Sequence, residues 1–355
     1  MRSRFFIALA STIVAIAFSV PVRAVQGPEK KEPIGAKWKH AFAVNKLLPP
    51  MFRQLDAPRK DGSELTIYLG NYQNSLDSEK PLLIYVEGSG AQSHFVALGK
   101  RIAWSTFGLI AKNYGPEHHV VTTEKRGVAF GFSAKRGTGE GGSKEYRRHA
   151  TLANRVRDVR LMLDTLLSEP MIDKSQVILL GHSEGADVAA AVSAVDDRVT
   201  HVAFLSGGGA AQFFDFFVQQ RKTLLKTGSS PEETEQSIAQ LESQIREILN
   251  DPQNDSRFFA GHSFNRWSSF ATVSAAENLL KTKAQLFLGH GTEDQSVPIE
   301  SFDFLVVELL RHGRLDARVR RYVGCDHSFI KVGEEPANEP FQNVIGEVLK
   351  WAGEK

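Results

Sequence analysis

Short apolar runs alternate with helical patterns along most of this chain, and that alternation constrains its fold more than any other feature. Between two of the runs, residues 152–166 carry apolar side chains at spacings of three and four, which is typical of an amphipathic helix. Continuous apolar runs are expected of strands that are covered on both faces. The alternation therefore predicts an α/β fold with a mostly parallel central sheet flanked by helices. The predicted buried strands are residues 82–86, 120–123, 177–180, 199–205, 284–288 and 317–323.

The composition supports a large folded core and argues against some classes of function. With 355 residues, of which 42% are hydrophobic, the chain can form two domains or one large domain that carries an insertion. The 43 basic and 41 acidic residues give a net charge of +2, which argues against a nucleic-acid binder driven by electrostatics. The single cysteine, Cys325, can form neither an intrachain disulfide nor a cysteine-based zinc site.

The first 24 residues have the three parts of a secretory signal peptide. Arg2 and Arg4 form a short positive region, residues 5–20 carry no charge, and Ala24 is a small residue at the expected cleavage point. The uncharged run of 16 residues is shorter than the roughly 20 that a membrane span needs. We therefore predict a signal peptide over residues 1–24 and a periplasmic or secreted bacterial protein. After cleavage near Ala24 we expect no stable insertion into the membrane.

Changes in these patterns predict the domain boundaries. Residues 25–60 are rich in proline and charge and are expected to form an N-terminal surface segment. Apolar and polar residues then alternate over 65–69, which predicts a half-buried early strand. The core is expected to comprise residues 61–209 and 284–355, with a helical insertion at 210–283 between two late strands.

The insertion contains a clear helix start. Ser230 is a suitable N-cap, Pro231 suits the first helical position, and Glu233 completes a capping box. Apolar residues then recur on one face over 238–248, and no convincing buried strand is found within 210–283.

The segment Gly181-His182-Ser183-Glu184-Gly185 follows a predicted strand and precedes a predicted helix. A serine hydroxyl is a poor nucleophile until a sharp turn holds it and a base accepts its proton. Gly181 and Gly185 remove side chains where the backbone turns and where the helix must approach the strand. The string alone is a weak signal, but this strand–turn–helix setting suits a nucleophilic Ser183.

Two later loops carry an acid and a histidine that could complete the site. Asp294 follows the strand at 284–288, with Glu293 as the local competitor, and His327 follows the last predicted strand. An acid at the end of a strand can accept a hydrogen bond from a histidine and fix its tautomer. The chain order is therefore Ser183, acid, histidine.

These three segments together resemble the α/β-hydrolase superfamily over roughly residues 60–352. The resemblance implies a nucleophile at Ser183, an acid at Asp294 rather than Glu293, and a base at His327. It also implies a helical cap at 210–283 and a reaction that needs no metal or organic cofactor. The matching segments are the elbow 181–185, the G-x-x-D-x-x-V-P turn at 291–298, the histidine loop 326–328, and 124–127, which resembles a D-x-R-G turn with a structural Arg126.

An oxyanion hole in such a site needs two backbone N–H donors. The resemblance assigns one donor to Glu184. The other is expected in the loop Glu87-Gly88-Ser89-Gly90, where position favours Ser89, with Gly90 as the alternative. Glu87 is expected to hydrogen-bond the glycine-rich loops. The Glu184 side chain is expected to face solvent or to cap a neighbouring helix, with binding of a substrate amine as the alternative.

The sequence thus predicts an exported serine hydrolase that cleaves a carboxylic ester or a thioester. A serine peptidase or amidase acting on small peptides is the alternative within the same chemistry. A non-catalytic protein that binds a ligand or partner is the alternative from a different class. The other histidines (His94, His118, His119, His182, His262 and His290) are interpreted as surface or satisfied loop residues, and Cys325 as a small buried thiol.

Overall fold

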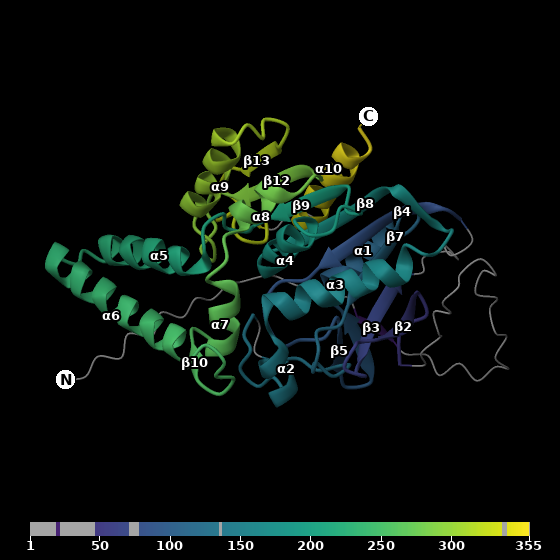
Figure 1. Ribbon diagram of the computed structural model, residues 1–355, viewed down its shortest axis with the longest axis horizontal. Coiled ribbons are helices and arrows are strands. Elements are labelled where there is room, and N and C mark those ends of the chain that lie inside the picture. The colour runs from purple at the N-terminus through teal and green to yellow at the C-terminus, as the bar shows by residue number, and fades with distance from the viewer. Residues whose placement is uncertain (1–18, 22–46, 71–77, 135–136, 336–338, 355) are drawn as a thin grey trace.

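The structure, a computed structural model, describes residues 19–21, 47–70, 78–134, 137–335 and 339–354 (Figure 1). Most of the predicted signal peptide therefore lies outside the described residues. Its residues Ser19–Pro21 form the short strand β1, which pairs antiparallel with β6 (Arg101–Trp104). Cleavage after Ala24 would remove β1 from the mature protein. The signal peptide stays a prediction.

Eight strands in the described part of the chain form the central sheet, in the order β13-β12-β9-β8-β4-β7-β3-β2. Neighbouring strands pair parallel from β13 to β7, whereas β3 pairs antiparallel with both β7 and β2. The mostly parallel sheet predicted from the sequence is thereby confirmed. The strands are β2 (Phe52–Pro58), β3 (Glu64–Gly70), β4 (Lys80–Val86), β7 (His119–Thr123), β8 (Ile172–His182), β9 (His201–Leu205), β12 (Gln285–Gly291) and β13 (Arg318–Tyr322).

Helices cover both faces of this sheet (Figure 1). Apolar residues of α3, α4, α8 and α9 pack against one face, and those of α1 and α10 pack against the other. Within β4, Leu82 and Ile84 face the first group of helices and Leu83 faces the second. The helices are α1 (Thr106–Tyr114), α2 (Lys144–His149), α3 (Leu152–Leu166), α4 (Glu184–Ser193), α5 (Gln212–Lys226), α6 (Pro231–Asn250), α7 (Phe264–Phe270), α8 (Ala275–Lys281), α9 (Ile299–Arg311) and α10 (Pro340–Ala352).

Two expectations for the amino-terminal part of the core are wrong. The predicted surface segment 25–60 contains β2, whose Phe52 is 1% exposed and belongs to the core. The strand predicted as half-buried has both faces covered, because the ring of Tyr68 packs edge-on against Phe95 at 4.9 Å. Phe95 lies on β5 (Phe95–Leu98), which forms a hairpin with β6 that the sequence patterns did not predict.

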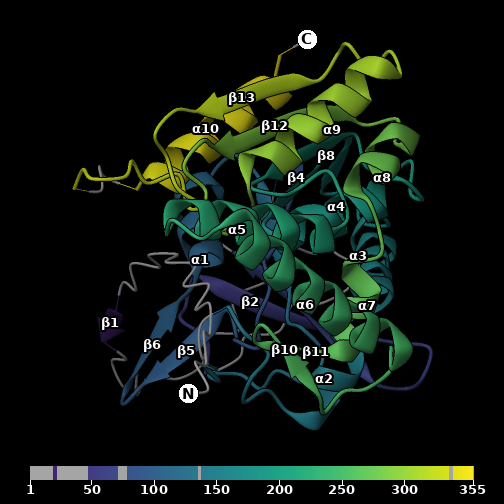
Figure 2. The ribbon, with the colours of Figure 1, turned by 90° about the vertical axis from the view of Figure 1, so that its left-hand side faces the viewer.

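Between β9 and β12 the chain leaves the sheet and forms a helical hairpin of α5 and α6 (Figures 1 and 2). The helix α6 begins as predicted: the Ser230 hydroxyl accepts from the Glu233 N–H at 3.1 Å, and the Glu233 carboxylate accepts from the Ser230 N–H at 2.9 Å. A two-residue hairpin, β10 (Phe258–Phe259) with β11 (His262–Ser263), and the helix α7 follow.

This inserted segment has an apolar cluster of its own, in which Phe213 packs with Trp267 and Ile245. The predicted insertion extends too far, however, because Ala276 and Leu279 of α8 pack into the main core against the sheet. We call residues 210–271 the inserted segment. No helix in the described segments combines the length and the apolar character that crossing a membrane requires.

Candidate active site

The turn between β8 and α4 holds Ser183 in a conformation that few non-glycine residues adopt. Its backbone angles are φ 59° and ψ −129°. A Cβ on Gly185 would collide with the carbonyl oxygen of Val86, and a Cβ on Gly181 would collide with Gly185 itself. Both glycines of the motif are therefore required for the helix to approach the strands this closely.

His327 and Asp294 form a buried hydrogen-bonded pair. The Nδ1 atom of His327 lies 2.7 Å from Oδ2 of Asp294, and the two residues are 5% and 6% exposed. Oδ1 of Asp294 accepts from the backbone N–H groups of Ser296 at 2.7 Å and Val297 at 2.9 Å. Burial acts to raise the pKa of Asp294, but the facing imidazole and these hydrogen bonds lower the pKa below its ordinary value. Because a carboxylate only accepts, Nδ1 donates and Nε2 remains available as a base.

Asp294, and not its neighbour Glu293, faces His327. The side chain of Glu293 is exposed, and its backbone N–H donates to the carbonyl of Cys325 at 2.9 Å, which ties the acid turn to the histidine loop. Asp294 alone of the two points its carboxylate at His327. Asp294 therefore stays the predicted acid.

Two side chains hold the loop that carries His327 beside Ser183. The carbonyl of His327 accepts from Nε2 of His182 at 2.9 Å and from the hydroxyl of Ser206 at 3.0 Å. His182 directly precedes Ser183, and its ring centroid lies 4.9 Å from that of His327. Among the described residues, the Ser183 hydroxyl and His327 do not hydrogen-bond to each other. Catalytic hydrogen bonds of this kind often shorten only when a substrate binds.

The loop after β4 lies directly over Ser183. A Cβ on Gly88 would stand 3.2 Å from the Cβ of Ser183. Gly90 has φ 102°, and the Ser89 hydroxyl donates to the carbonyl of Gly137 at 3.2 Å. The backbone N–H groups of Glu184, Ser89 and Gly90 find no acceptor among the described residues. They are free to bind an oxyanion, and Ser89 and Gly90 both remain candidates for the second donor.

The Glu184 side chain does not face solvent and does not cap a helix, contrary to expectation. It is 7% exposed and lies between two arginines. Oε1 accepts from Arg155 of α3 at 2.6 Å, and Oε2 accepts from Nη2 and Nε of Arg266 of α7 at 2.7 and 2.9 Å. Burial would raise the pKa of Glu184, but the two guanidinium groups lower it to about 2.

The sequence patterns gave no role to either arginine. Arg155 lies three residues after Leu152 and four before Val159, so it interrupts the apolar face of α3. A charged residue at that spacing is the signal that could have identified it, because such a side chain needs a buried partner.

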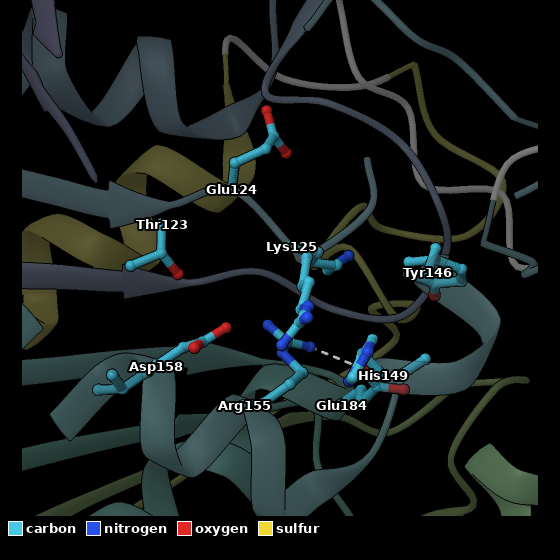
Figure 3. Close-up of a pocket in the computed structure, with 11 residues that line it drawn as sticks. Thr123, Glu124, Lys125, Tyr146, His149, Arg155, Asp158 and Glu184 are labelled. Atoms are coloured by element: carbon cyan, nitrogen blue, oxygen red, sulfur yellow. Dashed lines mark hydrogen bonds and ion pairs between the residues drawn. The ribbon is translucent and has the colours of Figure 1, made fainter. Parts of the chain in front are cut away.

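A second ion pair, between Glu87 and Lys125, contacts the loop after β4. The carboxylate of Glu87 pairs with Nζ of Lys125 at 3.0 Å, not with the glycine-rich loops as expected. Lys125 also donates to the carbonyl of Gly90 at 2.8 Å. Neighbouring Glu124 is buried, and burial raises its pKa to about 8. Figure 3 shows Glu124 and Lys125 with Arg155 and Glu184 around one small cavity.

Arg126 has the structural role that was predicted for it. Its guanidinium pairs with Asp61 at 2.6 Å and with Glu145 at 3.0 Å, and so joins the β2–β3 turn to α2.

The remaining histidines and the cysteine differ in part from expectation. The six histidines that we interpreted as surface or loop residues are all buried. Nε2 of His290 lies 3.6 Å from the Asp294 carboxylate. Cys325 is half-exposed rather than buried. Within the residues that the structure describes, no group of three His, Cys, Asp or Glu side chains is placed to hold a metal ion.

The inserted segment contacts the candidate site near both Ser183 and Asp294. Besides the Arg266–Glu184 pair, Gln212 donates to Asp187 at 2.5 Å on the first turns of α4. Gln219 donates to the carbonyl of Ser296 at 2.6 Å, beside the acid turn. The aromatic residues that begin the inserted segment mostly pack inside it, whereas Phe214 is 43% exposed.

Solved structures similar to this one include two peptidases and an alpha/beta hydrolase. The puromycin-hydrolyzing peptidase of Mycobacterium tuberculosis has 13% identity and a TM-score of 0.52 over 85% of this chain. The acylaminoacyl peptidase of Pyrococcus horikoshii has 12% identity and a TM-score of 0.52, also over 85%. The alpha/beta hydrolase GrgF of Penicillium sp. sh18 has 14% identity and a TM-score of 0.53 over 86%.

The length of the match differs among these proteins. The chain spans 39% and 41% of the two peptidases but 98% of GrgF. No protein-family model matches the sequence, and no curated protein matches it. At these identities the likeness concerns the fold, and the sheet order, the turn at Ser183 and the solved neighbours agree: the chain has the α/β-hydrolase fold.

Proposed function

We propose that this protein is a serine hydrolase that transfers an acyl group from its substrate to Ser183 and then to water. The observation that carries the proposal is the meeting of three elements at one place. Ser183 occupies a strained turn, a buried His327–Asp294 pair lies beside it, and a loop with free N–H groups covers it. Backbone strain of this kind is retained where the surrounding structure enforces it, as at catalytic turns.

In this reaction Ser183 Oγ attacks the substrate carbonyl carbon while Nε2 of His327 accepts the hydroxyl proton. Asp294 stabilises the imidazolium that forms. The N–H groups of Glu184 and of Ser89 or Gly90 stabilise the negative oxygen of the tetrahedral intermediate. His327 then donates this proton to the leaving group as its bond to the acyl carbon breaks. Water next attacks the acyl-enzyme while His327 accepts a proton from it, and that proton passes to Ser183 Oγ as the bond to the acyl group breaks.

Within this chemistry we infer a carboxylic ester or thioester as the substrate. The alternative is the amide bond of a small peptide, and the similarity to peptidases of known structure supports keeping it. We also propose export to the periplasm or beyond, on the evidence of residues 1–24. Detection of a mature amino terminus at residue 25 in the exported fraction would test this; an intact residue 1 there would contradict it.

The function is tested by the intact mass of the purified protein after treatment with a fluorophosphonate. We expect one adduct on the wild type and on Ser168→Ala, which changes an exposed serine just after α3, and none on Ser183→Ala. Panels of esters, thioesters and peptides would then rank the substrate classes. A folded wild type without an adduct would refute the hydrolase and favour the non-catalytic binding protein.

A further inference from the structure

The two donors of the proposed oxyanion hole come from different strands. Glu184 follows β8, and the loop with Ser89 and Gly90 follows β4. The two strands pair in parallel up to Val86 and Gly181, where the register ends. Beyond that point the sheet no longer fixes the distance between the donors. Other contacts must do so, because small displacements of catalytic groups are costly.

One side chain in the described structure binds both arms. Nη2 of Arg155 donates to the backbone carbonyl of Glu87 at 2.7 Å, and Nη1 donates to Oε1 of Glu184 at 2.6 Å. Nη1 also lies 3.5 Å from the carbonyl of Gly88. The side chain is only 14% exposed, and Figure 3 shows it extending from α3 to meet Glu184.

The charges around Glu184 also favour this role. A carboxylate on the residue that donates to an oxyanion would by itself repel the developing negative charge. Arg155 and Arg266 pair with its two oxygens, so the three side chains carry a net charge of +1. Loss of Arg155 would both release the carbonyl of Glu87 and reduce that charge to zero.

We propose that Arg155 is a positioning residue that holds the two arms of the oxyanion hole at the correct spacing. This inference rests on the proposed function. A guanidinium suits the task because its planar fork reaches two acceptors in a fixed geometry, whereas a lysine ammonium is a single flexible donor group. Arg155 does not touch the reacting atoms. It acts through the backbone carbonyl of Glu87 and the carboxylate of Glu184.

The test compares Arg155→Gln and Arg155→Lys with wild type, using an activated ester and a trifluoromethyl ketone. The ketone forms a tetrahedral oxyanion on the active serine and so reports on the hole directly. Arg157→Gln is the matched control, since Arg157 is exposed on the same helix and, among the residues that the structure describes, bonds only the carbonyl of Ala153. Thermal unfolding shows whether each variant is folded.

We expect kcat of Arg155→Gln to fall about 10–100-fold, because removal of one whole oxyanion donor costs about 10²–10³-fold. Affinity for the trifluoromethyl ketone should fall by a similar factor, while KM and the acid limb of the pH profile stay unchanged. Arg155→Lys should keep the charge and recover only part of kcat. Arg157→Gln should match the wild type.

Three results would overturn the inference. The first is a kcat within threefold of wild type in both variants. The second is a loss confined to KM, and the third is full rescue by lysine, which would make charge alone sufficient. If Arg155→Gln does not fold, Arg155→Lys decides. A wild type without a fluorophosphonate adduct on Ser183 would instead refute the proposed function itself.

Discussion

Replacing Asp294 by asparagine tests the proposed mechanism most directly, because the structure dictates how the new side chain must lie. Oδ1 of Asp294 accepts from the Ser296 and Val297 N–H groups at 2.7 and 2.9 Å. In the variant the amide oxygen must keep that position. Turning the amide around would leave two partly buried N–H groups facing NH₂, at up to about 1–3 kcal/mol for each unsatisfied donor.

The amide NH₂ of the variant then faces Nδ1 of His327, where Oδ2 lies 2.7 Å away in the wild type. To accept from that NH₂, Nδ1 must lose its proton, and the proton moves to Nε2. A protonated Nε2 cannot accept the proton of Ser183. In serine enzymes this tautomer error costs about 10⁴-fold in kcat, which corresponds to about 5 kcal/mol of transition-state stabilisation.

The measurement is kcat for an activated ester together with the rate constant of fluorophosphonate inactivation. Asp294→Asn should lower both by about 10⁴-fold while the unfolding midpoint stays close to that of wild type. Glu293→Gln is the control, because that carboxylate is exposed and the variant should keep its full rate. A rate for Asp294→Asn within tenfold of wild type would refute the assignment, as would an equal loss in Glu293→Gln.

Three further predictions concern stability. Gly185→Ala should lower the free energy of unfolding by about 1–3 kcal/mol and reduce activity, since its Cβ would meet the Val86 carbonyl; an unchanged urea midpoint would contradict this. Ser230→Ala should cost about 1 kcal/mol through the lost capping box, seen in thermal unfolding, and leave kcat unchanged. In the folded state, burial raises the pKa of Glu124 from its ordinary 4.5 to about 8. The contribution of protonated Glu124 to the free energy of unfolding is therefore lost as the pH rises from 4.5 to about 8. Glu124→Gln should therefore gain in unfolding temperature relative to wild type between pH 5 and pH 8; a constant difference would refute the buried proton.

Short sequence patterns predicted the parts of the fold that depend on contacts between residues close together in the sequence. The capping box at Ser230 needs only residues within one turn, and the apolar runs of β4 and β8 need only burial on both faces. The glycines at 181 and 185 indicated close approach of backbones, which the structure contains. These features required no knowledge of distant partners.

The errors arise where a distant segment changes the surroundings of a residue. Tyr68 alternates with apolar neighbours and so reads as solvent-facing, but Phe95, 27 residues later, covers it. Likewise β2 is an antiparallel edge strand that pairs only with β3 in the described sheet, so its short polar sequence lacks the apolar run of a central strand. The role of Arg266 was not predicted for the same reason, because its partner Glu184 lies 82 residues away in the sequence.

Local rules fail most informatively at Ser183 and Ser206, which both adopt positive φ without being glycine, at 59° and 50°. Each follows a parallel strand, and each donates its backbone N–H to the next strand of the sheet. Ser183 bonds the carbonyl of Leu205 at 2.9 Å, and Ser206 bonds that of Gly289 at 2.8 Å. The sheet therefore enforces the two unfavourable conformations in succession. One places a hydroxyl at the proposed nucleophile, and the other places a hydroxyl on the carbonyl of His327. Strain at two adjacent strand ends thus holds Ser183 and a hydroxyl that bonds the His327 loop, and glycine at either position would relieve the strain and remove the hydroxyl.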